Sequence, residues 1–124
     1  MSQAALFPEV TEELLQEVVR RIVAVGGPEK IVLFGSHARG TARSDSDLDL
    51  LIIEESAMPR HRRAARYRLA LLGLFPAKDI AVWTPAEVER WRDVSNAFIT
   101  SILAEGKVLY ERSNESNSPV AAQS

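Results

Sequence analysis

Hydrophobic residues near the start of the chain recur at helical spacing. The apolar positions of this segment are Leu14, Leu15, Val18, Val19 and Ile22. This spacing places them on one face of an amphipathic helix. Thr11 is a suitable N-cap residue, and Gly26, Gly27 and Pro28 interrupt the pattern. The pattern therefore predicts a helix that follows Thr11 and ends before Gly26.

Four later segments have the composition of strands. Residues 30–34 form a short run of Lys, Ile, Val, Leu and Phe, typical of a strand covered on both faces. Residues 47–53 begin with alternating polar and apolar residues and end in a continuous apolar run. Residues 78–83 and 107–110 are the third and fourth strand candidates. Residues 35–46 are small and polar, which predicts a loop.

Two further helical regions are predicted between these strands. Residues 58–75 place Ala64, Tyr67, Leu71, Leu72 and Phe75 on one side of a helix. Thr84-Pro85-Ala86-Glu87 has the pattern of a capping box, so a helix is expected to begin there, to break near residues 93–96, and to resume from Phe98 to Gly106. Trp83 and Trp91 flank this start and are interpreted as core or interface anchors.

These elements predict an α/β (α+β) fold: a small mixed sheet of about four strands packed with three to four helices. One domain is expected over residues 1–112, followed by a disordered tail over residues 113–124, which is rich in Ser and Asn.

Composition narrows the function classes. The chain has 124 residues and no cysteine, which excludes disulfides and zinc-thiolate sites. Its 15 basic and 17 acidic residues give a net charge of −2, which argues against a protein that coats nucleic acid. There is no targeting segment and no apolar run of the roughly 20 residues that a membrane helix needs. We therefore expect a cytoplasmic protein without membrane contact.

Three aspartates are candidate metal ligands. Asp47 and Asp49 lie two apart at the start of a strand, so their side chains project from the same face, with Cα atoms about 6.6 Å apart. Their mutual repulsion would be reversed by a divalent cation, and oxygen ligands suit Mg²⁺ or Mn²⁺. Asp79 would be a third ligand if its strand pairs with that of Asp49. The competing interpretation is a solvated strand edge.

The loop upstream of these aspartates offers groups that could bind phosphate. Gly35 and Ser36 end a strand and open a tight turn, where backbone N–H groups and a hydroxyl can hold phosphate oxygens. Arg39 and Arg43 could neutralise a polyphosphate. The alternative for these four residues is an ordinary turn followed by a solvated loop.

Gly35-Ser36, ten intervening residues and Asp47-Leu48-Asp49 resemble the G-S-x10-D-x-D signature of the DNA polymerase β nucleotidyltransferase superfamily. Residues 34–42 and 46–50 look like its minimal nucleotidyltransferase (MNT) branch, the MntA-type antitoxins of HEPN/MNT toxin–antitoxin systems. Asp79 matches the third acidic position of the family. His37 is a departure, because many relatives carry Arg or Tyr there.

The resemblance implies a polymerase β-like core and specific residue roles. Asp47 and Asp49 would bind two Mg²⁺ ions (Mn²⁺ is possible) that also hold the triphosphate of ATP. Asp79 would share the metal nearer the acceptor and help to activate its hydroxyl. Gly35 and Ser36 would bind the β and γ phosphates, with Arg39 and Arg43 nearby.

The resemblance also implies an acceptor. The shortness of the chain suggests that the acceptor is carried by another molecule, and members of the MNT branch transfer AMP from ATP to a tyrosine of a HEPN ribonuclease toxin. The leading hypothesis is therefore the antitoxin of a type VII-like pair, in a hetero-oligomer with its toxin and without a nucleic-acid template. The alternatives are an antitoxin that masks its toxin without catalysis and a small-molecule nucleotidyltransferase.

A basic stretch follows residue 59. Its members are Arg60, His61, Arg62, Arg63, Arg66 and Arg68. The favoured interpretation is a solvated helix face, on which Arg62, Arg63 and Arg66 lie opposite Tyr67 and Leu71 and His61 is at the surface. A docking surface for an acidic partner, or an aid to nucleotide binding, is the alternative.

Overall fold

The computed structural model describes residues 10–43, 46–74, 78–92, 94 and 98–112. Its strands are β1 (Lys30–Phe34), β2 (Leu48–Ile53), β3 (Lys78–Trp83) and β4 (Lys107–Glu111). Its helices over the described residues are α2 (Glu12–Val25), α3 (Ser36–Arg39), α4 (Arg60–Arg63), α5 (Ala65–Ala70), α6 (Pro85–Trp91) and α7 (Phe98–Glu105). The predicted mixed α/β class is confirmed. The tail predicted from residue 113 lies outside the described residues.

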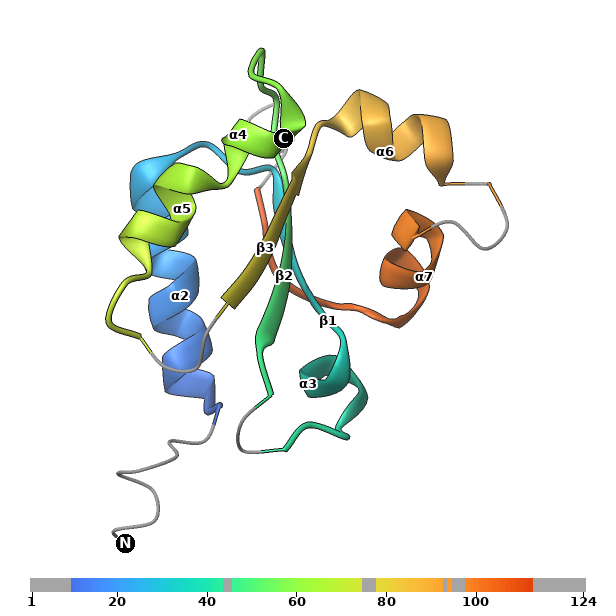
Figure 1. The fold of residues 1–124 in the computed structure, drawn as a ribbon. Coiled ribbons are helices and arrows are strands. Elements are labelled where there is room, and N and C mark those ends of the chain that lie inside the picture. The colour runs from blue at the N-terminus through green and yellow to red at the C-terminus, as the bar shows by residue number, and fades with distance from the viewer. Residues whose placement is uncertain (1–9, 44–45, 75–77, 93, 95–97, 113–124) are drawn as a thin grey trace, which may run out of the picture.

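The four strands form one mixed sheet in the order β3-β2-β1-β4 (Figure 1). β1 pairs antiparallel with both β2 and β4, whereas β2 pairs in parallel with β3. A parallel pair needs a crossover connection, and α4 and α5 lie in the segment that provides it. The strand that carries Asp79 therefore lies directly beside the strand that carries Asp49, as the metal-site prediction requires.

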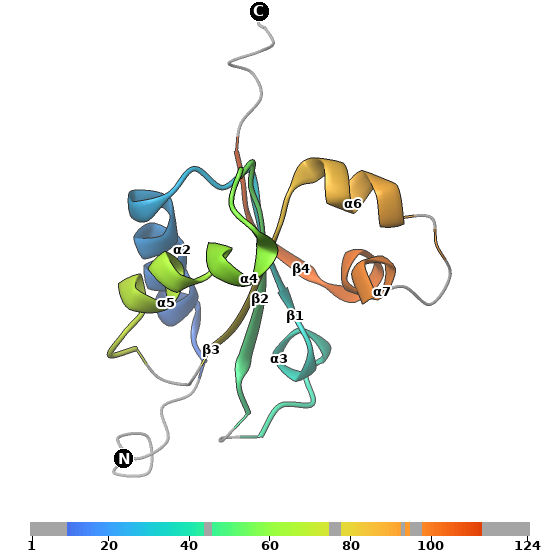
Figure 2. The ribbon, with the colours of Figure 1, turned by 45° about the horizontal axis from the view of Figure 1, so that its top comes forward.

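Helices cover both faces of the sheet, so there are two hydrophobic clusters (Figure 2). Leu48, Leu50 and Ile52 of β2 belong to the cluster under α2 and α5. Leu51 and Ile53 belong to the cluster under α6 and α7. Because side chains alternate along a strand, Asp49 projects from the same face of β2 as Leu51 and Ile53.

The predicted boundaries of α2 and α6 are confirmed. The hydroxyl of Thr11 accepts a hydrogen bond from the backbone N–H of Leu14 (3.1 Å), and α2 ends at Gly26. At the start of α6, the Glu87 N–H donates to the Thr84 hydroxyl (3.2 Å), and the Thr84 N–H donates to the Glu87 carboxylate (2.9 Å). The predicted break also holds, because α6 ends at Trp91 and α7 begins at Phe98.

The single helix predicted over residues 58–75 is wrong. The structure has two short helices, α4 and α5, separated at Ala64, and the second ends at Ala70. Leu72, predicted for the buried side, is 67% exposed. Gly73, with φ of +89°, lies in the turn that follows α5. Ala64, Tyr67 and Leu71 are buried as predicted, and Phe75 lies outside the described residues.

The predicted solvated arginine face is also wrong in part. Arg63 is only 8% exposed and forms two hydrogen bonds with the Glu87 carboxylate (2.7 and 3.1 Å). Arg66 pairs with the buried Glu54, whereas Arg62 and His61 are exposed as expected. Periodicity counts apolar residues and cannot show that a cation is drawn inward by a carboxylate.

None of the helices in the described ranges has the length and apolar character needed to span a membrane.

Candidate active site

The turn after β1 brings Gly35 to the centre of the candidate site. Gly35 has φ of +77°, a left-handed conformation that glycine adopts without the strain imposed by a Cβ atom. The next four residues form α3, a single helical turn in which the Ala38 and Arg39 N–H groups donate to the Gly35 carbonyl (both 3.1 Å). The loop predicted over residues 35–46 thus contains a short helix, and Gly40 ends it.

Gly35 and Asp49 approach each other too closely for any larger residue at position 35. A Cβ atom on Gly35 would lie 3.0 Å from Cγ of Asp49 and closer still to its Oδ2. Real Cβ atoms essentially never approach another atom so closely. The absent side chain therefore lets the Asp49 carboxylate lie against the backbone that leads into Ser36.

The sheet register sets Asp49 beside Asp79. Asp49 is opposite Phe34, the last residue of β1, and on its other side it is opposite Asp79 of β3. Directly opposed residues of neighbouring strands point to the same face, so Asp49 and Asp79 share one. Asp47 precedes β2 by one residue and is exposed. The strand pairing that the assignment of Asp79 as a third ligand required is present.

The electrostatics of Asp49 reflect this crowding. Burial raises the pKa of the Asp49 carboxyl, and the negative charges of Asp79 and Asp47 raise it further. The positive charge of Arg39 and the nearby His37 act in the opposite direction. Asp49 is half-buried, whereas Asp47 and Asp79 are exposed. A cation bound between these carboxylates would remove an existing repulsion.

The basic residues of the loop differ in their relation to the site. Arg39 is close enough to Asp49 to lower its pKa, and its Nη1 lies 3.9 Å from Oε1 of Glu105 at the surface. Arg43 is exposed, and its backbone N–H donates to the Ser46 hydroxyl (2.8 Å). The Arg43 side chain has no ion pair or hydrogen bond with any other described residue. The structure thus brings Arg39, but not the Arg43 side chain, toward Asp49.

His37 is a residue whose position the sequence reasoning missed. Its Nε2 lies 3.2 Å from the Ser46 carbonyl oxygen, so the ring connects α3 to the residue that precedes Asp47. Its charge also acts on Asp49. The one available signal was its place directly after Ser36, and that place does not show that the loop folds back to it.

The donor set fits a hard divalent cation bound together with a substrate. Among the residues that the structure describes, no group of three or more Asp, Glu or His side chains is arranged to hold a metal ion by itself. Mg²⁺ is usually held by one or two carboxylates, substrate phosphates and water rather than by an all-protein cage. The half-buried Asp49, the neighbouring Asp47 and Asp79, and the open backbone at Gly35 match that mode of binding.

Aromatic residues flank the carboxylates on the same face of the sheet. The rings of Phe34 and Phe98 pack edge to face with their centroids 5.7 Å apart. The ring centroids of Phe98 and Trp83 are 6.2 Å apart. The guanidinium of Arg60 covers the Trp83 ring at 4.4 Å. Trp83 is therefore a core residue, as predicted, whereas Trp91 is 42% exposed.

A family model and a curated relative both identify this chain as similar to nucleotidyltransferases. The sequence model of the nucleotidyltransferase domain family matches residues 10–104 of this chain. A Methanocaldococcus jannaschii protein, named as a candidate protein adenylyltransferase, is 40% identical over 91 residues. That match covers 68% of this chain and 59% of the relative, so the chain spans less than two thirds of the relative's length.

Solved structures share the fold. A candidate nucleotidyltransferase from Sulfolobus solfataricus aligns with a TM-score of 0.57 and 22% identity, over 81% of this chain and 79% of its own. A toxin–antitoxin crystallised with AMP-PNP aligns with a TM-score of 0.52 and 19% identity, over 83% and 77%. A mutant of the toxin–antitoxin MntA-HpeT aligns with a TM-score of 0.51 and 17% identity, over 83% of this chain and 77% of its own.

Proposed function

The chain belongs to the nucleotidyltransferase domain family, and from that premise we propose that it transfers AMP from ATP to a tyrosine hydroxyl of a partner protein. The partner would be a HEPN-type ribonuclease toxin, and this chain would be its antitoxin. The observation that carries the proposal is the register that sets Asp49 beside Asp79 on one face, with Gly35 against the Asp49 carboxylate.

Each residue has a role in this proposal. The Gly35 backbone and the Ser36 hydroxyl bind the β and γ phosphates, and Arg39 neutralises part of their charge. Asp47 and Asp49 would hold Mg²⁺, with Asp79 as the ligand nearer the acceptor. When bound, Mg²⁺ would supply Lewis-acid stabilisation of the attacking and leaving oxygens.

The transfer itself balances as a single displacement. The tyrosine oxygen forms a bond to the α phosphorus of ATP, and the bond from that phosphorus to the oxygen bridging to the β phosphate breaks. Pyrophosphate leaves, and Asp79 accepts the phenolic proton. Because phosphoryl transfer depends mainly on positioning and charge neutralisation, these few residues suffice for the protein's part.

A protein acceptor is supported by the comparisons. The curated relative is named for transfer of adenylyl groups to protein. Two of the structural neighbours are toxin–antitoxin assemblies, one of them crystallised with an ATP analogue. The net charge of −2 also suits a protein partner better than a nucleic-acid template.

The test is a transfer assay with the toxin encoded beside this chain. We expect incubation with ATP and Mg²⁺ to add AMP to a toxin tyrosine, detected by intact mass and peptide mapping. The variant Asp47→Asn with Asp49→Asn should fold, as judged by circular dichroism, and transfer nothing. Absence of an adduct with the wild-type chain, or undiminished transfer by the double variant, would contradict the proposal.

The same double variant separates modification from masking. If it still silences the toxin in cells, neutralisation proceeds by binding alone. Transfer to a free alcohol or aminoglycoside in the absence of any protein partner would instead indicate a small-molecule nucleotidyltransferase.

A further inference from the structure

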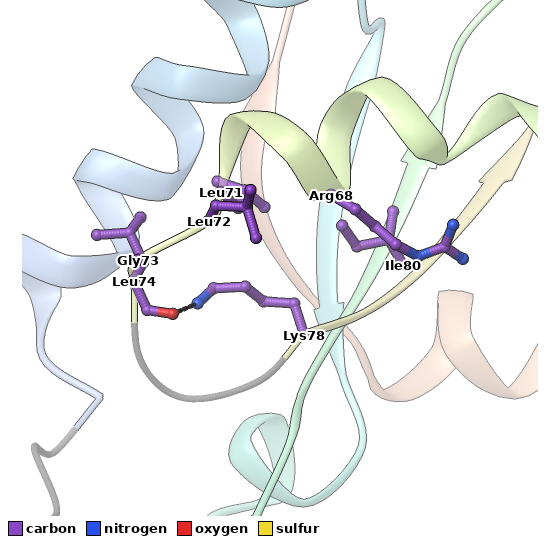
Figure 3. A pocket seen from close by; sticks show the side chains of 7 residues that line it. All are labelled: Arg68, Leu71, Leu72, Gly73, Leu74, Lys78 and Ile80. Carbon is purple, nitrogen blue, oxygen red and sulfur yellow. Dashed lines mark hydrogen bonds between the residues drawn. The ribbon is translucent and has the colours of Figure 1, made fainter.

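A hollow lies beside β3 on the face opposite to Asp79. It has a volume of about 210 Å³ and is formed by α5, the turn after it and the start of β3. Figure 3 shows Leu71 and Leu72 on one side, Ile80 and Arg68 on another, and Lys78 extending toward the Leu74 carbonyl. The walls are thus mainly apolar, with two cationic side chains among them.

The arginines that precede the hollow are mostly engaged within the chain. Arg63 pairs with Glu87, Arg66 pairs with Glu54, and Arg60 lies over the Trp83 ring. Arg68 differs from these three, because it has no ion pair or hydrogen bond through its side chain within the described part of the chain. Its positive charge at the wall of the hollow is therefore available to an anion from outside.

The surface around the hollow is also unusually apolar. Leu69 and Leu72 are 68% and 67% exposed, more than any other large hydrophobic side chain among the described residues. Arg68, near the end of α5, and Leu72, in the turn after it, both line the hollow. Leu69 borders them. Exposed apolar residues gathered around a hollow are typical of an interaction site.

The location links this surface to the candidate active site. Lys78 in the wall of the hollow is followed directly by Asp79. β3 is an edge strand of the sheet, so the two side chains lie on opposite faces of the same exposed strand end. A molecule held in the hollow is positioned to reach around this edge toward Asp79.

We propose that Arg68, Leu69, Leu72 and the hollow form a docking surface for an acidic, apolar segment of the acceptor protein. One apolar side chain of that segment fills the hollow, and a neighbouring carboxylate pairs with Arg68. A cavity of about 150 Å³ accommodates a benzene-sized group, so the observed volume has room for a leucine or phenylalanine side chain. This inference rests on the proposed function only in taking the acceptor to be a protein.

Charge complementarity and lining favour an acidic protein segment over RNA. Single-stranded nucleic acid is held by a row of cations with aromatic platforms. Among the described residues, the lining has two cations and four larger apolar side chains, and none of those residues is aromatic. A segment with a carboxylate next to an apolar residue complements both the cationic and the apolar side chains of the lining.

The test measures binding without chemistry. The full chain is titrated with the neighbouring toxin by calorimetry, with ATP omitted. We expect Arg68→Glu and Leu72→Asp each to weaken binding by about tenfold or more, as for the central residues of a protein interface. Both residues are exposed, so circular dichroism should show an intact fold.

Two matched controls accompany these variants. Arg62→Glu changes an exposed arginine of the same basic stretch that does not line the hollow. Val108→Asp changes a half-exposed apolar residue on β4, the opposite edge of the sheet. Both should bind the toxin with nearly wild-type affinity. Equal loss in controls and test variants would overturn the proposal.

A crosslinking experiment identifies the bound segment. A benzophenone amino acid at Leu69 should crosslink to a toxin segment that contains both acidic and apolar residues. Substituting Lys for the acidic residue of that segment should then restore binding to Arg68→Glu. A crosslink confined to a basic segment, or loss of RNA binding or self-association in the variants with unchanged toxin affinity, would overturn the proposal.

The outcomes for docking and for chemistry can be separated. Toxin binding that depends on Arg68 and Leu72, without any AMP adduct, supports the docking surface and contradicts the proposed transfer. AMP transfer with wild-type affinity in both variants supports the transfer and overturns the docking surface. A toxin that does not bind the wild-type chain overturns the docking proposal.

Discussion

Gly35 shows how a single missing side chain shapes the candidate site. It combines a φ of +77° with close contact to the Asp49 carboxylate. We expect Gly35→Ala to abolish nucleotide transfer and to lower the free energy of unfolding by about 1–3 kcal/mol, since backbone strain and the collision with Asp49 add together. Thermal unfolding and the transfer assay measure the two effects.

Gly40 provides the matched control for this substitution. Its φ is +80°, but nothing lies within 4 Å of the position that a Cβ atom would take. Gly40→Ala should therefore show the stability cost of the backbone conformation and keep most of the transfer activity. Equal loss of activity in both variants would show that the contact with Asp49 is unimportant.

Asp49 is expected to reduce the stability of the metal-free protein. Because its pKa is raised in the folded state, the fold favours the protonated carboxyl, and this contribution to stability is lost as the pH rises through the raised pKa. Asp49→Asn should thus raise the melting temperature in EDTA at pH 7 while abolishing transfer. The gain should shrink as the pH falls through the raised pKa of Asp49, and it should be absent below 3.8, the ordinary pKa of aspartate.

Asp47→Asn should change the melting temperature less, since Asp47 is exposed. A lower melting temperature for Asp49→Asn than for the wild-type chain at pH 7 would contradict this interpretation of the site's electrostatics.

At the residue scale, the sequence offered candidate site residues but could not predict the contacts between them. Gly35 lies against Asp49, and Asp79 lies beside Asp49 in the sheet, whereas the signature itself covers Asp47 and Asp49 but not Asp79. The role of His37 was not predictable, because it depends on Ser46 folding back to it across nine positions. The close approach of Gly35 to Asp49 likewise depends on the antiparallel register of β1 and β2.

Among the elements, α4 is connected to α6 by Glu87, which pairs with Arg63 at 2.7 Å and with Arg60 at 3.7 Å. Hydrogen bonds from Arg63 lower the pKa of Glu87 to about 2. A carboxyl with a lowered pKa stabilises the fold above its ordinary pKa of 4.5, and this stabilisation is lost as the pH falls toward 2. We expect Glu87→Gln to cost about 2 kcal/mol at pH 7 and almost nothing near pH 2, measured by urea unfolding.

Glu89→Gln is the control for this prediction. Glu89 pairs with Arg92 on α6, but its side chain is 72% exposed and that of Arg92 is 49% exposed. Such exposed pairs contribute little, so the variant should unfold like the wild-type chain. Similar pH profiles for Glu87→Gln and the wild-type chain would show that the Arg63 pair does not stabilise the fold.

The same region shows where sequence reasoning about elements succeeds and fails. The capping box at Thr84 was predictable because all of its hydrogen bonds lie within four residues. The division of residues 58–75 into two short helices was not predictable, because no Pro or Gly between residues 60 and 70 marks the break at Ala64. The ion pair of Arg63 with Glu87 likewise joins residues that are 24 positions apart and leaves no local signal.

For the whole molecule, the proposed nucleotide and metal should stabilise the fold together. A ligand that binds only the folded state at about 100 times its Kd adds about 2.7 kcal/mol to stability. We therefore expect ATP with Mg²⁺ to raise the melting temperature by several degrees. EDTA should remove the shift, and Asp49→Asn should not show it. A shift of the same size in EDTA would contradict metal-assisted binding.

The sequence predicted the four strands but not their order. Each strand has a local apolar signature, whereas the order β3-β2-β1-β4 depends on contacts between distant segments. The parallel pairing of Asp49 with Asp79 spans 30 positions. It could be stated only as a condition for the metal site, and the structure satisfies that condition.

That pairing has a consequence for protein synthesis. The ribosome makes the chain from its N-terminus, so Gly35, Ser36, Asp47 and Asp49 emerge well before Asp79. A nascent chain that has not yet added β3 at the edge of the sheet lacks its third carboxylate. The proposed site is therefore complete only in a chain whose crossover has formed, and we expect a chain truncated before β3 to transfer no nucleotide.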